Sequence, residues 1–282
     1  METERVRFSQ NKSLLRTLVK NSYRAIDDGA YENKEERDYL HHDSIDLRNR
    51  IIECQNIPII TEIKYASPSK GVLADPMKVT VESIAQVMQN SGATGISVLS
   101  QPFLFNGSIT NVYKARRAST LPILMKDIVV SEIQLKAAKK AGADYILLIK
   151  TIFDMNLTES TLETIIERAR KIGLGVILET HTTDEFKEAM VMNKKYKQQN
   201  LIGINNRNLD TLEISLDTTK NILAENPKSG NVIISESGIH KGSDIAKLLA
   251  AGADAFLVGT SLMQDTEKMA DGIKEIISSL NR

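Results

Sequence analysis

Charged side chains follow an apolar stretch near residue 60, and their types suit proton transfer. Residues 57–63 are rich in isoleucine, which predicts a strand buried on both faces. Glu62 and Lys64 stand two residues apart at its end, so their side chains project to the same face. Such a pair can exchange protons with a substrate or form a structural ion pair. The following turn, SPSKG, places the hydroxyls of Ser67 and Ser69 at the same end.

The same kind of ending recurs along the chain, where short β-branched stretches stop at a polar side chain. Lysine and glutamate are costly in a protein interior unless they are paired, so several of them at strand ends indicate a functional site. Each residue alone could instead be a helix cap, a turn or a surface group, and only the set favours a site. With the neighbouring glycines, the residues at or just after these later strand ends are Lys126, Glu179, Asn205, Arg207, Glu236, Ser237, Gly238, Gly259 and Thr260.

A lysine at a strand end has two main catalytic uses. It can donate a proton as a general acid, or its neutral amine can form a Schiff base with a carbonyl substrate. By position, Lys64, Lys126 and Lys150 are candidates for either use. His181, two residues after Glu179, is interpreted as a neighbour of the next helix cap rather than as a ligand.

The elements that must position these residues alternate along the chain. Eight strands are predicted at residues 57–63, 95–99, 122–126, 144–149, 175–179, 201–205, 232–236 and 255–258. Amphipathic helices are predicted at residues 81–91, 131–141, 161–172, 183–192, 217–224, 243–251 and 267–280. The phrase Ala-Gly-Ala-Asp follows two of these helices, and its glycine is typical of a helix C-cap.

Strands that alternate with helices predict a parallel sheet. Eight βα units in residues 57–282 fit a closed (β/α)8 TIM barrel, in which active sites lie at the C-terminal ends of the strands. The competing fold, an open doubly wound sheet, usually has a G-x-G-x-x-G turn after its first strand, and none follows here. Glycines and hydroxyls after the seventh and eighth strands predict a phosphorylated small-molecule substrate, because barrels often bind phosphate there.

Residues 1–56 are predicted to form a helical extension before the barrel. The apolar spacing of residues 14–19 indicates one amphipathic helix. Residues 25–42 are highly charged and are expected to be exposed or mobile. A second helix is expected to lead into the first strand, with Asp43 or Ser44 as its N-cap.

Composition argues against several classes of protein. Lys and Arg total 36 and Asp and Glu total 36, so the basic excess of a nucleic-acid binder is missing. No apolar run approaches the roughly 20 residues that span a bilayer, and no Cys/His cluster has metal-ligand spacing. One cysteine, Cys54, and the lack of a secretory signal favour a reducing cytoplasm. His41 and His42 are interpreted as solvated surface. A monomer is expected, with a dimer left open.

Several stretches, taken in order, resemble one enzyme family. They include IPIITEIKYASPSKG, LPILMKDIVVSEIQ, LIGINNRNLDTLEI and IISESGI, and with the stretches between them they cover nearly all of residues 57–263. This combination is highly specific, and by it the chain resembles the indole-3-glycerol phosphate synthases. The resemblance implies decarboxylating ring closure and dehydration of 1-(2-carboxyphenylamino)-1-deoxyribulose 5-phosphate. The products are indole-3-glycerol phosphate, CO2 and water in tryptophan biosynthesis, and no cofactor or metal is implied.

The resemblance also implies roles for individual residues. Lys126 is similar to the general acid that protonates the ketone oxygen as the aryl carbon attacks. Glu179 resembles the acid/base that assists loss of the hydroxyl group in the dehydration. Lys64 resembles the partner of the substrate carboxylate and a second proton donor, and Glu62 is expected to orient the lysines.

The remaining expected site residues fall into three groups. Asn205 and Glu236 are expected to hold the site and the sugar hydroxyls. The phosphate group or its immediate surroundings would involve Ser67, Ser69, Arg207, Ser237, Gly238, Gly259 and Thr260. The apolar pocket for the aromatic ring would be formed by Phe105, Leu147, Leu209 and Leu257. In the family the N-terminal extension packs over the catalytic face, so deletion of residues 1–42 is expected to weaken substrate binding.

Some positions depart from the family pattern, and other functions compete. Ile128 stands where the family commonly has Phe, which removes an aromatic wall from the ring pocket, and Tyr65 replaces a commonly basic residue. A Schiff-base aldolase using Lys126 or Lys150 is the second hypothesis. A non-catalytic phosphate-binding scaffold is the third, although a scaffold needs no paired acid and base.

Overall fold

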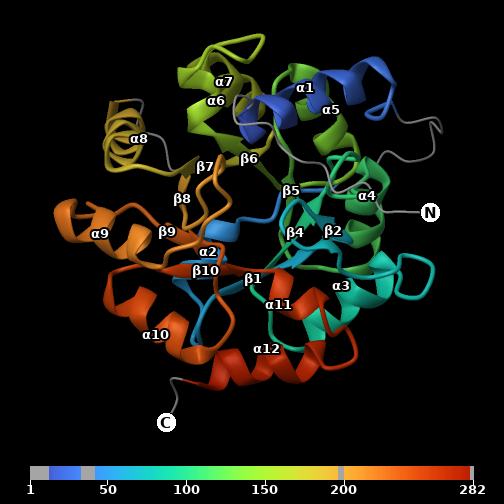
Figure 1. Ribbon diagram of the computed structural model, residues 1–282, viewed down its shortest axis with the longest axis vertical. Helices are drawn as coiled ribbons and strands as arrows, with labels where there is room; N and C mark the ends of the chain where they lie inside the picture. Colours follow the sequence, from blue (N-terminus) through green and yellow to red (C-terminus); the bar gives the residue numbers. More distant parts are fainter. Residues whose placement is uncertain (1–12, 33–41, 196–199, 280–282) are drawn as a thin grey trace.

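Eight parallel strands form a closed barrel at the centre of the computed structural model, which describes residues 13–32, 42–195 and 200–279 (Figure 1). The strands are β1 (Ile59–Ile63), β4 (Gly95–Leu99), β5 (Ile123–Lys126), β6 (Tyr145–Ile149), β7 (Gly175–Thr180), β8 (Leu201–Asn205), β9 (Ile233–Glu236) and β10 (Ala255–Val258). They neighbour one another in sequence order, and β1 closes the barrel by pairing with both β4 and β10. The predicted (β/α)8 fold is confirmed, with each strand within two residues of its predicted bounds.

Most of the helices lie around the outside of the barrel (Figure 1). In chain order they are α1 (Leu14–Asp27), α2 (Leu47–Ile52), α3 (Val81–Asn90), α4 (Ile109–Ala118), α5 (Glu132–Lys140), α6 (Lys150–Asp154), α7 (Leu162–Lys171), α8 (Thr183–Lys195), α9 (Asp217–Glu225), α10 (Gly242–Ala250), α11 (Thr260–Met263) and α12 (Met269–Ser278). Nearly every strand residue is buried, as a sheet covered by helices requires. The apolar runs in the sequence therefore mark the strands well.

Three helices were not among those predicted from the sequence. The largest is α4, where Ser108 caps the helix and Ile109, Val112 and Ala115 face the core. Its Ile-Thr-x-Val opening has low helix propensity, which masked this signal. The short helices α6 and α11 directly follow β6 and β10. A small antiparallel hairpin, β2 (Ala66–Ser67) with β3 (Gly71–Val72), lies in the loop after β1.

Asp144 lies at the N-terminal end of the barrel, opposite the predicted site, and joins the segment before α2 to β5. Its carboxylate accepts hydrogen bonds from the backbone N–H groups of Ile45 and Ile123, both at 2.8 Å. Arg116 lies 3.1 Å from one oxygen of this carboxylate, and His42 Nε2 lies 2.9 Å from the other. The interpretation of His42 as solvated surface is therefore wrong, because its ring pairs with a fully buried acid. His41 lies outside the described residues.

The segment before β1 differs from expectation in two further ways. Helix α2 begins two or three residues later than predicted, since its N-cap is Asp46, which accepts from Asn49 N, and not Asp43 or Ser44. Ser44 Oγ instead donates to Gly173 O, between α7 and β7. Residues 25–42 were expected to be exposed or mobile, yet Tyr31 is only 6% exposed. The part of that prediction at residues 33–41 lies outside the described residues.

Helix α1 lies against loops at the C-terminal ends of the strands. Ser13, its N-cap, donates to Asp210 at 2.6 Å in the segment after β8. The Arg24 guanidinium lies 4.6 Å from the ring centroid of Phe103, in the loop after β4. Tyr31, just beyond α1, donates to the Asp127 carboxylate at 2.8 Å. The leucines that form the buried face of α1 therefore reach the mouth of the barrel.

Candidate active site

A cavity of about 480 Å³ opens at the C-terminal ends of the strands, the end at which barrels of this type carry their active sites. Its volume is in the range of a small-molecule site. The predicted site residues that line it are Glu62, Lys64, Ser67, Ser69, Phe105, Lys126, Leu147, Glu179, Asn205, Arg207, Leu209, Ser237, Gly238, Leu257, Gly259 and Thr260. Glu236 does not reach the cavity surface, but it is bonded to Lys126 directly beneath it.

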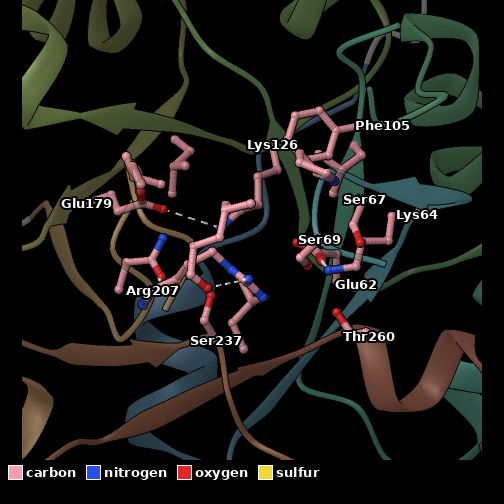
Figure 2. A pocket seen from close by; sticks show the side chains of 18 of the residues that line it. Glu62, Lys64, Ser67, Ser69, Phe105, Lys126, Glu179, Arg207, Ser237 and Thr260 are labelled. Atoms are coloured by element: carbon pink, nitrogen blue, oxygen red, sulfur yellow. Dashed lines mark hydrogen bonds and ion pairs between the residues drawn. The ribbon is translucent and has the colours of Figure 1, made fainter. Parts of the chain in front are cut away.

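Lys126 is the centre of a cluster of charges. The last residue of β5, it lies 3.4 Å from Glu179 Oε2, at the end of β7, and forms an ion pair with Glu236, at the end of β9. Figure 2 shows Lys126 and Glu179 pointing toward each other in the cavity. Burial disfavours the ammonium group, but Glu236, Glu179 and Glu62 outweigh burial and raise the pKa of Lys126. Lys126 is therefore a firmly protonated acid.

The pKa values of the two carboxyl groups beside Lys126, those of Glu179 and Glu236, are shifted in opposite directions. Both are buried, which favours the neutral form of each. For Glu179, the charges of Lys126 and His181 overcome burial and lower the pKa to about 2. For Glu236, burial wins with help from the nearby Glu179 charge, and the pKa rises to about 7 although Lys126 opposes the shift. One carboxylate is thus fixed as a base, and the other can hold a proton near neutral pH.

Glu62 and Lys64 lie on the same side at the end of β1, as the two-residue spacing predicted, and form an ion pair (Figure 2). The carboxylate is almost completely buried, and the lysine side chain is 13% exposed. Gly259 packs so closely here that a Cβ atom on it would lie 2.5 Å from Glu62 Oε1. A glycine after β10 is therefore needed to leave room for the pair.

The loops after β8 and β9 form the polar end of the cavity. Arg207 is half-buried, and its backbone N–H donates to Asn205 Oδ1 at 3.0 Å. Ser237 and Gly238 both have left-handed backbone, with φ of 68° and 80°, which turns the chain sharply away from β9. Asn206 Nδ2 donates to Ser237 O at 3.1 Å and so fixes this turn from outside the cavity. Of the adjacent asparagines, one thus faces the site and the other supports the loop.

The apolar side of the cavity is larger than the sequence indicated. Ile128, the residue noted above as a departure from the family pattern, is buried and lies on this wall. Lining residues absent from the predictions include Leu14, Leu18, Leu99, Gln101, Ile149, Leu212, Ile214, Ile239 and His240. The apolar members of this group carry no signal in the sequence beyond that of core residues. Gln101, two residues after β4, follows a strand end and could have been found by the rule that identified Lys126.

Two candidates raised by the sequence lie outside the cavity lining. Lys150, on α6, is bound to Asp154 at 2.7 Å and Glu188 at 2.5 Å, and faces the outside of the barrel. It is therefore wrongly placed for a Schiff base in this site. His181 directly precedes Thr182, whose hydroxyl accepts from Glu185 N at the start of α8, as its interpretation as a cap neighbour predicted. Its ring nevertheless lies beside Glu179.

The described part of the chain contains no group of three His, Cys, Asp or Glu side chains arranged to hold a metal ion. In the same residues there is no helix with the length and apolar character needed to cross a bilayer. Comparison with solved structures finds the same fold in thiamine phosphate pyrophosphorylase from Pyrococcus furiosus, with a TM-score of 0.53 and 16% identity over 82% of this chain and 96% of that one. N-acetylmannosamine-6-phosphate 2-epimerase from Clostridium perfringens gives 0.55 and 13%, over 82% and 98%.

Sequence comparison is more specific than the fold. A family model described as indole-3-glycerol phosphate synthase matches residues 17–276. The chain is 34% identical to the indole-3-glycerol phosphate synthase of Campylobacter fetus subsp. fetus over 82% of this chain and 84% of that protein. It is 40% identical to that of Sulfurisphaera tokodaii over 78% and 82%. With a barrel, a cavity and a lysine–glutamate cluster at the expected end, the chain belongs to the indole-3-glycerol phosphate synthase family.

Proposed function

We propose that the cavity carries out the reaction of its family by general acid–base catalysis with Lys126, Glu179 and Lys64. That reaction is the decarboxylating ring closure and dehydration of 1-(2-carboxyphenylamino)-1-deoxyribulose 5-phosphate. The observation that carries the proposal is the position of Lys126 between Glu179 and Glu236, in a cavity that also contains the Glu62–Lys64 pair.

Ring closure is the step assigned to Lys126. The ring carbon that bears the carboxylate attacks the ketone carbon, and Lys126 donates a proton to the ketone oxygen as it becomes a hydroxyl group. Loss of CO2 from the ring carbon then returns the bonding electrons to the ring and restores its aromatic character. Neighbouring carboxylates keep Lys126 protonated before the substrate arrives, as this role requires.

Dehydration is the step assigned to Glu179 and Lys64. Because Glu179 is held as a carboxylate, the first transfer it can make is to accept a proton. That proton comes from the methylene carbon next to the ring nitrogen, while the hydroxyl group leaves as water with a proton from Lys64. Two protons are donated and one is accepted, so the sequence consumes one proton and the substrate carboxylate leaves as CO2.

Binding is assigned to the two remaining parts of the cavity. Arg207, the turn at Ser237–Gly238 and the backbone at Gly259–Thr260 supply donors for the phosphate group, with Ser67 and Ser69 across the opening. The wall of Phe105, Leu147, Leu209 and Leu257 accommodates the ring, and Lys64 pairs with the ring carboxylate before decarboxylation. Asn205 and Glu236 hold the sugar hydroxyls and the catalytic lysine.

A Schiff-base aldolase remains the rival function, and the electrostatics oppose it. A lysine nucleophile must be neutral, and burial or a nearby cation normally provides that state. Around Lys126 three carboxylates act in the opposite direction. Borohydride treatment in the presence of substrate is therefore expected to leave no covalent adduct on the protein, whereas an aldolase would be trapped.

The central test is turnover of the carboxyphenylamino substrate, followed by the fluorescence of the indole product. Lys126→Ala is expected to lower kcat by about 10²–10⁴-fold or more, because a general acid typically contributes that much. The control is Lys136→Ala on the exposed face of α5, which removes the same charge far from the cavity. Absence of product from the unmodified protein at every pH would refute the reaction, and normal turnover by Lys126→Ala would refute the assigned acid.

We further propose that residues 1–56 serve as an extension that completes the site of a barrel formed by residues 57–282, and that the protein works in the cytoplasm as a monomer. The contacts of α1 with the loops after β4 and β8 support the first point. The monomer is proposed because large exposed apolar side chains are scattered, with Val72 on β3, Met77 in the loop before α3 and Val191 on α8. Light scattering of the purified protein in solution measures its molar mass and so tests the oligomeric state.

A further inference from the structure

His181 lies between two carboxylates, one inside the cavity and one outside it. Its Nε2 atom is 3.2 Å from Glu179 Oε1, and its Nδ1 atom is 3.6 Å from Glu185 Oε2 and 3.3 Å from Thr151 Oγ1. The side chain is 12% exposed, and His181 is not among the residues that line the cavity. Within the described part of the chain, His181 Nε2 makes no aligned hydrogen bond, and its contact with Glu179 is an ion pair.

Glu179 is held on both of its oxygens by different cations. Oε2 faces Lys126 from β5, and Oε1 faces His181 from the start of the loop after β7. The other charged group that acts on Glu179 is Glu236 from β9, which is itself bonded to Lys126. The charged groups that face His181 are Glu179 and Glu185, and together they raise the pKa of the ring to about 9 although burial lowers it. Lys150, on the neighbouring α6, is paired elsewhere.

We propose that His181 is a positioning residue, which holds Glu179 as an oriented carboxylate after Lys126 has given up its proton. Before ring closure, Glu179 has two cations beside it. Once Lys126 has protonated the ketone oxygen it is neutral, and His181 is the remaining cation in contact with Glu179 among the described residues. The later step, in which Glu179 accepts a proton, therefore depends on the charge of His181. This inference rests on the function proposed above for Glu179.

The connection to Glu185 explains how the ring keeps its place. Glu185, on α8, accepts hydrogen bonds from His181 N at 2.6 Å and from Thr151 Oγ1 at 2.6 Å, so it is fixed by the loop after β7 and by α6. A residue that merely preceded a helix cap would need no buried ring between two acids. The imidazolium links the start of α8 to the catalytic carboxylate.

The first test is the pH dependence of kcat for His181→Gln, measured at saturating substrate. Loss of one cation beside Glu179 is expected to raise the pKa of that carboxyl group. The acidic limb of the profile of kcat against pH is therefore expected to move to higher pH by about one to three units. The value of kcat is expected to fall, with a smaller change in KM. The control, His42→Gln, removes a histidine paired with Asp144 at the opposite end of the barrel and leaves the limb in place. An unmoved limb in His181→Gln would overturn the inference.

Glu179→Gln separates this inference from the proposed function. If Glu179→Gln turns over normally, the assigned base is wrong and the role of His181 falls with it. If Glu179→Gln is inactive and the limb of His181→Gln does not move, only the role of His181 is wrong.

The second test measures the charge of the ring in the unmodified protein, and variants serve only for assignment and comparison. Nitrogen-15 resonances of the histidine rings, with His181 assigned by its loss in His181→Gln or His181→Asn, report the charge of the ring directly. His181 is expected to stay protonated at pH 8 and to titrate near 9. In Glu185→Gln it is expected to titrate at lower pH. A ring that is neutral at pH 8 in the unmodified protein would contradict the proposal.

Discussion

Lys126 and its two acids illustrate how far single residues can be interpreted from their positions in the sequence. Each could be identified because a charged residue at the end of a buried strand is unusual. Their pairing could not, because Lys126, Glu179 and Glu236 come from three different strands and meet only after the barrel closes. The opposite pKa shifts of Glu179 and Glu236 depend on that pairing and on burial, neither of which appears in the local sequence.

Asp127, next to Lys126, is a buried acid whose pKa shift makes the stability of the protein depend on pH. It is 2% exposed, and its carboxylate accepts from Tyr31, Ser100 and the backbone N–H of Ile128. Burial outweighs these hydrogen bonds and raises its pKa to about 6. Because the raised value favours the protonated form in the folded state, the contribution of Asp127 to stability is full below about pH 4 and is lost as the pH rises through 6.

Asp127→Asn is therefore expected to flatten part of the pH dependence of stability. Between pH 4.5 and pH 7 the unmodified protein should lose more unfolding free energy than the variant, by on the order of 2 kcal/mol. Urea unfolding of both proteins at the two pH values measures this difference, and the comparison cancels the contributions of other groups. Equal losses in the two proteins would show that Asp127 titrates alike in the folded and unfolded states.

At the scale of elements, strands were predicted better than the N-terminal segment. A strand buried on both faces produces an apolar run that few other structures share, so all eight were located. Tyr31 lies among charged residues, and its burial results from Asp127 and Gln134, about a hundred positions away. No local pattern can reveal such a partner.

Tyr31→Phe tests how strongly this segment is attached. The variant loses its donor to Asp127 and its acceptor for Gln134 Nε2 at 3.2 Å. Because both partners are buried, the free energy of unfolding is expected to fall by about 1–3 kcal/mol. Tyr23→Phe is the matched control, since that hydroxyl donates to Leu157 O at 3.2 Å in a part-buried position, and a smaller loss is expected. Chemical denaturation measures both, and equal losses would contradict the attachment.

Gly107 sets the shape of the loop that carries Phe105. A Cβ atom on Gly107 would lie 2.6 Å from Leu99 O and 2.7 Å from Gln101 O, so the backbone would have to move. Gly107→Ala is expected to raise KM and to cost about 1–3 kcal/mol in stability. Gly272→Ala is the control, because its Cβ atom would meet only the end of Leu262 at 3.3 Å, in a helix that alanine favours. Unchanged kinetics for Gly107→Ala would show that the loop does not position Phe105.

At the scale of the whole molecule, the closed barrel can be predicted from the repeated βα units of the sequence. The position of the N-terminal extension cannot. Eight units of similar length predict closure without any knowledge of individual contacts. Helix α1 occurs once, and its contacts are with the segments after β4, α6 and β8, so periodicity says nothing about where it lies. The resemblance to a family supplied that expectation instead.

Deletion of residues 1–42 tests the extension. It removes Leu14 and Leu18 from the cavity wall and Tyr31 from Asp127. Loss of two leucine contacts corresponds to roughly 1–2 kcal/mol of binding, so KM is expected to rise about tenfold with a smaller change in kcat. Steady-state kinetics on the truncated protein gives the answer. A KM equal to that of the full chain would mean that the extension contributes no binding energy.

The pairing of β1 with β10 has a consequence for folding during synthesis on the ribosome. Ile59, Ile60 and Thr61 pair with Phe256, Leu257 and Val258, so the first strand to emerge waits for the last. Until then the growing sheet has two unpaired edges, and such edges recruit strands from other molecules. A chain that stops before Ala255 is expected to accumulate as aggregate instead of a smaller soluble barrel. Contacts this distant in sequence also form slowly, so closure is expected to limit the rate of folding.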